Sequence, residues 1–339
     1  MRKRSWWRPR AWRFGAAALV CIGLTGCSRQ SILSDHSKVT HDIGLLWWWM
    51  LGAAVIVFFG AVLLLVVAFL KRRVPGLPIL GEREPVAQGM VLVFGIAVPL
   101  VALVVLFAFS DVYLENVTAA PAADTTSMTI DVIGHQWWWE VRYDGGRAIT
   151  ANEIHIPVRT RVNVVVTTAD VIHSFWVPAL NGKIDMIPGR RNHELLDASQ
   201  PGVYRGQCSQ YCGLQHAHMA FLVYAQPMAK FRAWLANQER PAINPTGAAA
   251  IRGKADFMND QCASCHLIAG TQAQGYIGPA LTHLATRSTL ASNTIPNTPT
   301  WLARWIHDPQ AIKPGDRMPD LGIPPRQIRD IVAYLDELK

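Results

Sequence analysis

The stretch QCSQYCGLQHAHM, residues 207–219, places two cysteines, two histidines and a methionine close together in the chain. Thiolate, imidazole and thioether groups are the ligands that copper prefers, and copper sites that carry electrons combine cysteine and histidine with a weak methionine. A further histidine stands far upstream. Two thiolates can bridge two metal ions, with one histidine on each ion. The pattern therefore predicts a dinuclear copper site whose candidate ligands are His173, Cys208, Cys212, His216 and Met219.

Two other interpretations of the same residues stay open at this point. Structural zinc would use the two cysteines with His216 and His173, but it leaves Met219 without a role. A disulfide between Cys208 and Cys212 is the purely structural alternative, because an exported protein can form one. The copper interpretation is preferred because it uses the methionine as well.

The motif QCASCH, residues 261–266, is a C-x-x-C-H haem attachment sequence. In such a motif Cys262 and Cys265 bind the haem vinyl groups and His266 coordinates the iron. Met318 follows about 50 residues later and can supply the opposite ligand. Met258 is the rival ligand, but it stands too close to the attachment site to reach the other haem face. Histidine–methionine ligation suits electron transfer, because it raises the haem potential and leaves no open position on the iron.

Composition limits the kind of protein that carries these motifs. The chain has 339 residues, which suggests several domains, and half of them are hydrophobic. The apolar residues gather before residue 110, so the chain is not one soluble globule. Its formal charge is +8, but six positive charges and no acid lie in residues 1–26. Because the remainder is close to neutral, a nucleic-acid partner is not implied.

The N-terminal residues 1–26 have the charged start and short apolar run of a secretory signal. Their end, Leu24-Thr25-Gly26 before Cys27, resembles a bacterial lipobox, and this resemblance implies cleavage before Cys27 and lipid attachment to its sulfur. An uncleaved anchor with a chance cysteine is the alternative. Residues 27–44 are then an external N-terminal segment.

Two apolar runs, residues 45–70 and 86–110, are each long enough to cross a bilayer, and together they predict a transmembrane hairpin over residues 45–110. The loop between them carries Lys71, Arg72, Arg73 and Arg83. The positive-inside rule places this loop in the cytoplasm, so both ends of the hairpin lie outside.

The rest of the chain divides by pattern. Residues 111–127 are predicted to be a linker, 128–228 a β domain, 229–247 a short helix and second linker, and 248–339 a helical domain. Turn signals separate short β-rich runs in the β domain, which favours a sandwich or barrel. Examples of these strands are 129–133, 153–158, 161–167 and 220–225. Residues 228–238 indicate a short helix, and the clearest helices are 301–307 and 327–338.

The order of these features resembles subunit II of cytochrome c oxidase over roughly residues 40–228, followed by a fused cytochrome c domain. The resemblance implies a multi-domain membrane protein with a two-helix transmembrane hairpin, a cupredoxin-like β-barrel and an all-α class I cytochrome c domain. It implies a dinuclear CuA centre that also uses the backbone carbonyl of Gln210, and a covalently attached haem c. By family spacing His218 is not a ligand. The family usually has a glutamate at Gln210, whose carboxylate serves a magnesium site shared with subunit I, and Gln210 lacks that carboxylate.

The resemblance also implies a function, namely electron transfer from haem c to the copper centre and on to subunit I, which reduces oxygen with proton pumping. Trp137 occupies the position where electrons enter, although an aromatic residue on a strand is more often core. Implied partners are subunits I and III, an external cytochrome c or membrane-bound donor, and membrane lipid. The implied location is the bacterial cytoplasmic membrane, with both cofactor domains on the periplasmic side. The family often has a glutamate near the proton-uptake route, in the cytoplasmic half of the second span. That register holds only apolar residues here, and Glu82 and Glu84 lie earlier in the chain.

Rival functions predict different metal ligands, cofactors or membrane segments. A quinol-oxidase subunit II lacks the copper ligands, whereas a carrier for a nitrogen-oxide reductase keeps them but does not need the hairpin. A structural lipoprotein predicts neither copper nor haem. Residues 128–226 contain eight basic and eight acidic residues, so no net acidic charge attracts a basic soluble cytochrome to the β domain. A tethered donor is compatible with this balance, because a linker supplies a high effective concentration.

Overall fold

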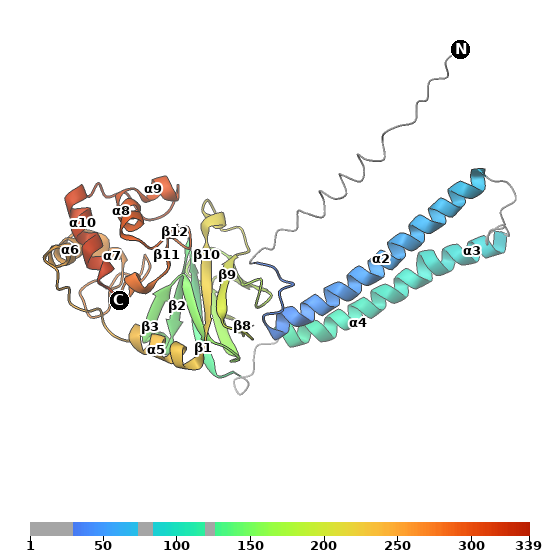
Figure 1. Ribbon diagram of the computed structural model, residues 1–339, viewed down its shortest axis with the longest axis horizontal. Coiled ribbons are helices and arrows are strands. Elements are labelled where there is room, and N and C mark those ends of the chain that lie inside the picture. Colours follow the sequence, from blue (N-terminus) through green and yellow to red (C-terminus); the bar gives the residue numbers. More distant parts are fainter. Residues whose placement is uncertain (1–29, 74–83, 119–125) are drawn as a thin grey trace, which may run out of the picture.

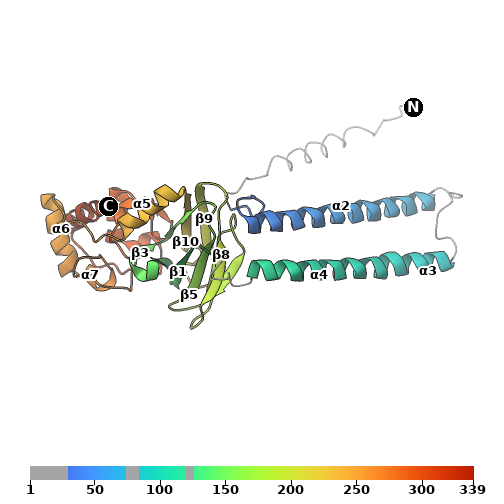
Figure 2. The same cartoon turned by 90° about the horizontal axis from the view of Figure 1, so that it is seen from below.

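The computed structural model describes residues 30–73, 84–118 and 126–339. Three parts follow one another along its long axis: a helical hairpin, a β domain and a mainly helical C-terminal domain (Figure 1). The turned view in Figure 2 has the same order, with the β domain in the middle. The predicted signal at 1–26, Cys27 and Glu82 lie outside the described residues.

The hairpin consists of two long helical arms that lie side by side in both views. Its elements are α2 (Lys38–Arg73), α3 (Glu84–Leu92), the π-helical turn η1 (Val93–Ala97) and α4 (Val98–Thr118). Lys38–Lys71 and Glu84–Asp111 are each long and apolar enough to cross a membrane. Large apolar side chains are exposed along both arms, as with Ile56 and Phe107, each 75% exposed. A helix pair with such a surface is suited to lipid rather than water.

Both arms are longer than the predicted spans. Helix α2 begins before residue 45, and α4 continues to Thr118, inside the predicted linker at 111–127. The physical reason is that residues 111–118 contain neither glycine nor proline, so nothing in the sequence stops the helix where the apolar run ends.

Ten strands form two five-stranded sheets that face each other. One sheet has the order β3-β2-β1-β5-β8 and the other β4-β10-β9-β6-β7. The strands are β1 (Met128–His135), β2 (Trp138–Tyr143), β3 (Ala148–Ala151), β4 (Glu153–Pro157), β5 (Val162–Thr168), β6 (His173–Trp176), β7 (Lys183–Met186), β8 (Asn192–Leu196), β9 (Gly202–Cys208) and β10 (Ala220–Gln226). Short 3-10 turns lie at η3 (Asp144–Gly146) and η4 (His216–His218).

An aromatic cluster fills the space between the sheets. Trp139, Phe175 and Phe221 have no exposed surface, and the Phe221 ring lies 4.8 Å from Trp139 and 4.9 Å from Phe175 between ring centroids. Strands β6 and β9 pair antiparallel, with Phe175 opposite Cys208. This register brings His173, at the start of β6, to the end of β9, where the loop with the paired cysteines begins.

The C-terminal domain is mainly helical. Helix α5 (Met228–Gln238) packs on the β domain, and the other helices are α6 (Ala248–Asn259), α7 (Cys262–Cys265), α8 (Pro299–His307), α9 (Pro309–Ile312), α10 (Pro325–Asp336) and the 3-10 turn η5 (Leu284–Thr286). Helices α6 and α10 cross closely: a Cβ at Gly253 would lie 1.8 Å from the carbonyl oxygen of Asp330. The expected all-α domain also contains a short β-ribbon, β11 (Thr289–Leu290) paired with β12 (Ile295–Pro296).

The C-terminal domain docks on the end of the β domain away from the hairpin (Figure 1). The buried Glu153 carboxylate accepts hydrogen bonds from the backbone and the hydroxyl of Ser288, both at 2.8 Å. The carbonyl of Trp137 accepts another from the hydroxyl of Ser292 at 2.7 Å. These bonds join groups that are 135 and 155 residues apart in sequence.

Candidate functional site

Sulfur and imidazole groups converge at the end of the β domain, where β6 meets the loop after β9. The two thiols, Cys208 Sγ and Cys212 Sγ, lie 3.8 Å apart and are free. His173 Nδ1 lies 3.9 Å from Cys208 Sγ, and His216 Nδ1 lies 3.6 Å from Cys212 Sγ. Met219 Sδ lies 3.7 Å from Cys212 Sγ. The structure thus brings together all five side chains that the sequence pattern predicts as ligands.

Two further residues of this loop take separate positions. The backbone carbonyl of Gln210 lies 3.1 Å from Cys208 Sγ, while its side chain is exposed. His218 is exposed, and its Nδ1 lies 2.6 Å from the side-chain oxygen of Gln215. Gln210 can therefore offer its carbonyl to a metal, whereas His218 has a hydrogen-bond partner outside the cluster.

Burial and hydrogen bonds set the charge of the cluster. The hydrogen bond with Cys212 lowers the pKa of the Cys208 thiol far below its usual value, which favours the thiolate form at this sulfur. Burial by itself lowers the pKa of His173, but hydrogen bonds to Asp170 and Cys208 outweigh it and raise the pKa. Asp170 Oδ1 lies 2.8 Å from His173 Nε2, which directs Nδ1 toward the thiols. Two close sulfurs, two imidazoles and a thioether, mostly buried, fit copper.

A cavity in the C-terminal domain collects the residues of the predicted haem site. Cys262, Cys265, His266 and Met318 all line it, and its other walls include Phe257, Leu281, Ile306 and Ile331. Gly278 makes room for the histidine, because a Cβ there would lie 2.6 Å from the imidazole. The structure therefore brings the two thiols, the imidazole and the thioether to one apolar cavity, as a flat, mostly apolar haem requires.

The chemistry of individual groups fits the same ligand. His266 Nδ1 lies 2.8 Å from the carbonyl of Pro279, so Nδ1–H donates to it and Nε2 is left for a metal. Burial lowers the pKa of His266, which keeps the imidazole neutral. Arg287 lines the cavity, its buried Nε has no hydrogen-bond partner among the described residues, and burial lowers its pKa to about 10. A buried guanidinium with a free donor suits an anionic carboxylate such as a haem propionate.

Trp137 lies between the two sites. It lines the cavity, it is 6% exposed, and its indole Nε1 donates to the carbonyl of Cys212 at 3.0 Å. The Gln136 amide donates to the same carbonyl at 2.8 Å. Trp138 also lines the cavity but stacks on His135, with ring centroids 4.2 Å apart, and Trp139 is part of the sandwich core. Of the three tryptophans, Trp137 is the one with a hydrogen bond to the loop of the predicted copper ligands.

Sequence patterns did not indicate several residues at this junction. Asp170 orients His173, Gln215 donates to the carbonyl of Pro314 at 2.6 Å, and Arg317 binds the side-chain oxygen of Gln136. Arg287 faces the cavity. These residues are polar and isolated in the sequence. The contacts of Gln215 and Arg317 form only where the β domain and the C-terminal domain meet, whereas Asp170 and Arg287 act within one domain each.

Comparison with known proteins finds a family match for the β domain and another for the C-terminal domain. Residues 147–226 match the family described as cytochrome C oxidase subunit II, periplasmic domain, and residues 250–339 match the family described as cytochrome c. The predicted resemblance is confirmed. The chain is similar to cytochrome c oxidase subunit II, with a cytochrome c domain after the cupredoxin-like domain, and the expected fold class is confirmed with it.

Two curated relatives and one solved structure illustrate this similarity. Cytochrome c oxidase subunit 2 of Alkalihalophilus pseudofirmus is 36% identical over 220 residues, and that of Bacillus sp. (strain PS3) is 31% identical over 230 residues. The matches cover 65% and 64% of this chain, and the chain spans 64% of the length of each relative. The crystal structure of the periplasmic domain of subunit II of cytochrome oxidase from Bradyrhizobium japonicum is 35% identical, with a TM-score of 0.33, and covers 34% of this chain and 94% of that one.

Proposed function

We propose that this chain is the electron-transfer subunit II of a haem–copper cytochrome c oxidase. In this proposal electrons pass from a haem c in the C-terminal domain to a dinuclear CuA centre in the cupredoxin-like domain, and then to subunit I. The position of Trp137 carries the proposal, because its aromatic side chain lines the cavity of the predicted haem ligands and donates to the carbonyl of Cys212. Both cofactors, when bound, accept and release single electrons.

The copper pair would be held by His173, Cys208, Cys212, His216 and Met219, with the carbonyl of Gln210. Burial of both cysteines supports this assignment, since both are 4% exposed and solvent is largely kept from the sulfurs. Asp170 holds the His173 ring through Nε2, so the imidazole needs little rearrangement to bind a metal.

The haem would be attached through Cys262 and Cys265 and ligated by His266 and Met318. Pro279 orients His266 through its carbonyl. Asp316 accepts a hydrogen bond from the backbone N–H of Met318 at 3.0 Å, which fixes the loop that carries the thioether. Arg287 is the expected partner of a propionate.

Trp137 is the proposed contact through which electrons leave the cytochrome c domain. Its ring reaches the copper loop, and its carbonyl is bound by Ser292 of the C-terminal domain. An aromatic ring that spans two domains in this way offers a short route between their buried sites. The C-terminal domain also covers the surface of the cupredoxin-like domain around Trp137. This contact favours a tethered electron donor over a soluble one that binds at the same surface.

The remaining parts of the proposal concern the surroundings of the chain. The hairpin would anchor it in the bacterial cytoplasmic membrane, beside subunits I and III, with the two cofactor domains in the periplasm. An external cytochrome c or membrane-bound donor would reduce the haem. Oxygen reduction and proton pumping would take place on subunit I. Magnesium binding at Gln210 is not proposed, because its side chain is exposed and has no carboxylate.

One experiment tests the proposal as a whole: purification of the native complex in mild detergent, with analysis of copper, haem and oxygen consumption. We expect two copper ions and one haem c per chain, a haem–copper partner subunit, and oxygen uptake driven by reduced cytochrome c. A complex that oxidises quinol and holds no copper, or a chain purified without a haem–copper partner, would contradict the assignment. A nitrogen-oxide reductase as the partner would favour the rival carrier function.

A further inference from the structure

Lys313 is a buried cation at the junction of the two domains. It follows α9, and its side chain is only 2% exposed. Its ammonium donates to the carbonyl of Trp137 at 3.1 Å and pairs with the carboxylate of Asp316 at 3.2 Å. The hydroxyl of Ser292 donates to the same Trp137 carbonyl at 2.7 Å. The C-terminal domain thus places two donors on one carbonyl of the copper domain.

We propose that Lys313, assisted by Ser292, is a positioning residue for electron transfer between the two cofactors, an inference that rests on the proposed function. Lys313 holds the backbone of Trp137 against the cytochrome c domain, while the indole of Trp137 holds the copper loop through Cys212. Trp137 is therefore held both at its indole ring and at its backbone carbonyl. Among the described residues, Lys313 is the only charged group with a hydrogen bond to that carbonyl.

Burying an ammonium group costs much free energy unless the charge is paired and hydrogen-bonded. Asp316 and the Trp137 carbonyl meet both conditions. Burial lowers the pKa of Lys313, and the charge of Asp316 acts in the opposite direction. Because the pair is shielded from solvent, its attraction is less screened by salt than that of a surface pair. A lysine that served only to keep the domain soluble would not be placed here.

Asp316 links this contact to the predicted haem ligand. One carboxylate oxygen pairs with Lys313, and the other accepts the backbone N–H of Met318. The same loop rests on the copper loop through Gln215, which donates to Pro314. Lys313 therefore lies in a short series of contacts that begins at the Met318 loop and ends at the Trp137 backbone. Loss of the lysine should change the distance and orientation of the two sites rather than either site itself.

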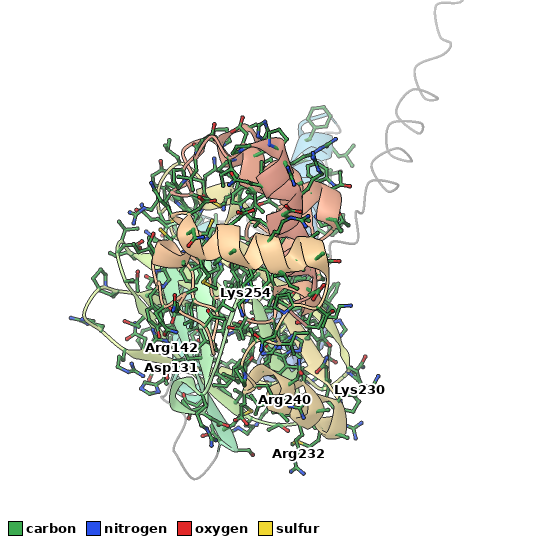
Figure 3. All side chains as sticks on the ribbon, turned by 90° about the vertical axis from the view of Figure 1, so that its left-hand side faces the viewer. Asp131, Arg142, Lys230, Arg232, Arg240 and Lys254 are labelled. Carbon is green, nitrogen blue, oxygen red and sulfur yellow. The ribbon has the colours of Figure 1, made fainter. Side chains whose placement is uncertain are left out.

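The test uses the full chain in mild detergent with both cofactors bound. A photoactivated ruthenium complex reduces the haem, and absorbance follows electron transfer to copper. Lys313→Met keeps the length of the side chain without its charge, and Ser292→Ala removes the second donor. Lys230→Met is the matched control, because Lys230 is exposed on α5 at the edge of the molecule in Figure 3. Lys313→Arg keeps a charged donor.

We expect Lys313→Met to slow the transfer about tenfold, because the loss of one hydrogen bond from a charged group lowers the population of the docked arrangement by about that factor. Ser292→Ala should slow it less, Lys313→Arg should restore much of the rate, and Lys230→Met should leave it unchanged. The haem potential and the copper resonance spectrum should stay as in the wild type. A Lys313→Met rate equal to the wild-type rate would overturn the inference, and so would a slower rate that Lys313→Arg does not improve.

A second measurement does not depend on loaded cofactors. Hydrogen exchange of the full chain, with and without cofactors, should show faster exchange at residues 212–218 and 313–318 in Lys313→Met and in Ser292→Ala, but not in Lys230→Met. Unchanged exchange in both variants would overturn the inference even if Lys313→Met failed to bind haem. Absence of copper or haem from the wild-type chain would instead contradict the proposed function and leave the exchange experiment to decide the role of Lys313.

Discussion

The indole nitrogen of Trp137 donates a hydrogen bond to the carbonyl oxygen of Cys212 at 3.0 Å. Trp137 also lines the cavity that holds Cys262, His266 and Met318. One side chain therefore contacts the loop of the predicted copper ligands and the pocket of the predicted haem ligands. Because Gln136 binds the same carbonyl, the loop of the predicted copper ligands keeps a second hydrogen bond when the indole is removed.

Trp137→Phe keeps an aromatic ring but removes the indole donor. We expect slower electron transfer from haem to copper, and a loss of about 1 kcal/mol in stability for the buried hydrogen bond. Trp138→Phe is the control, because Trp138 lines the same cavity yet stacks on His135. Photoreduction of the haem measures both rates. Equal rates for the two variants would remove Trp137 from the proposed route.

Met318→Ala tests the sixth ligand of the haem. The thioether stabilises the reduced iron, so its loss should leave the haem attached through Cys262 and Cys265 but lower the midpoint potential by on the order of 0.1 V or more. Met258→Ala is the matched control: Met258 is partly buried against the same core but is not part of the cavity wall. A potentiometric titration gives both values. A potential unaffected by Met318→Ala would exclude Met318 as the ligand.

The two neighbouring histidines of the copper loop should behave differently. His216 Nδ1 lies 3.6 Å from Cys212 Sγ, whereas His218 is bound to Gln215. We expect His216→Gln to weaken copper binding by at least about tenfold and to abolish the resonance signal of two coppers that share one electron. His218→Gln should keep the copper content and the signal. Loss of copper in His218→Gln alone would reverse the assignment.

Glu194 on β8 should make the stability of the β domain depend on pH. Burial raises the pKa of its carboxyl from 4.5 to about 8 in the folded chain. The folded state therefore keeps a proton between these values that the unfolded state has lost, so stability falls as pH rises through this range, by up to about 5 kcal/mol. Glu194→Gln should raise the melting temperature above pH 8 and change it little below pH 4.5.

Thermal unfolding of the full chain, followed by circular dichroism at both ends of this pH range, measures the effect. Glu239→Gln is the control, since Glu239 is an exposed residue at the end of α5. An equal gain in melting temperature at both pH values would mean that Glu194 does not titrate differently in the folded state.

Local patterns predicted much of this molecule. The apolar runs indicated both arms of the hairpin, and the helix at 228–238 has the bounds that the sequence indicated. Strands at 129–133 and 220–225 fall within β1 and β10. Ligand types at short spacing also indicated the cluster of predicted copper ligands, because the end of β9 and the loop after it carry four of the five side chains. His173 was predicted from its ligand chemistry rather than from its spacing in the sequence. The pairing of β6 with β9 explains why it lies beside the other four side chains.

The sequence could not predict how the two cofactor domains meet. Contacts such as Lys313 with Trp137 join residues 176 positions apart, and Gln215 with Pro314 joins residues 99 apart. No periodicity or motif marks such pairs, since each depends on the docked surfaces. The end of α4 was placed too early for a simpler reason: the prediction followed the apolar run, whereas the helix ends later, at Thr118.

The central claim is that electrons move within this chain from the cytochrome c domain to the copper domain. Photoreduction of the haem in the full chain, with absorbance recorded for both cofactors, tests it most directly. We expect the haem to be reoxidised and copper to be reduced with one shared first-order rate that does not depend on protein concentration. Copper that stays oxidised while the haem stays reduced, or a rate that rises with protein concentration, would contradict it.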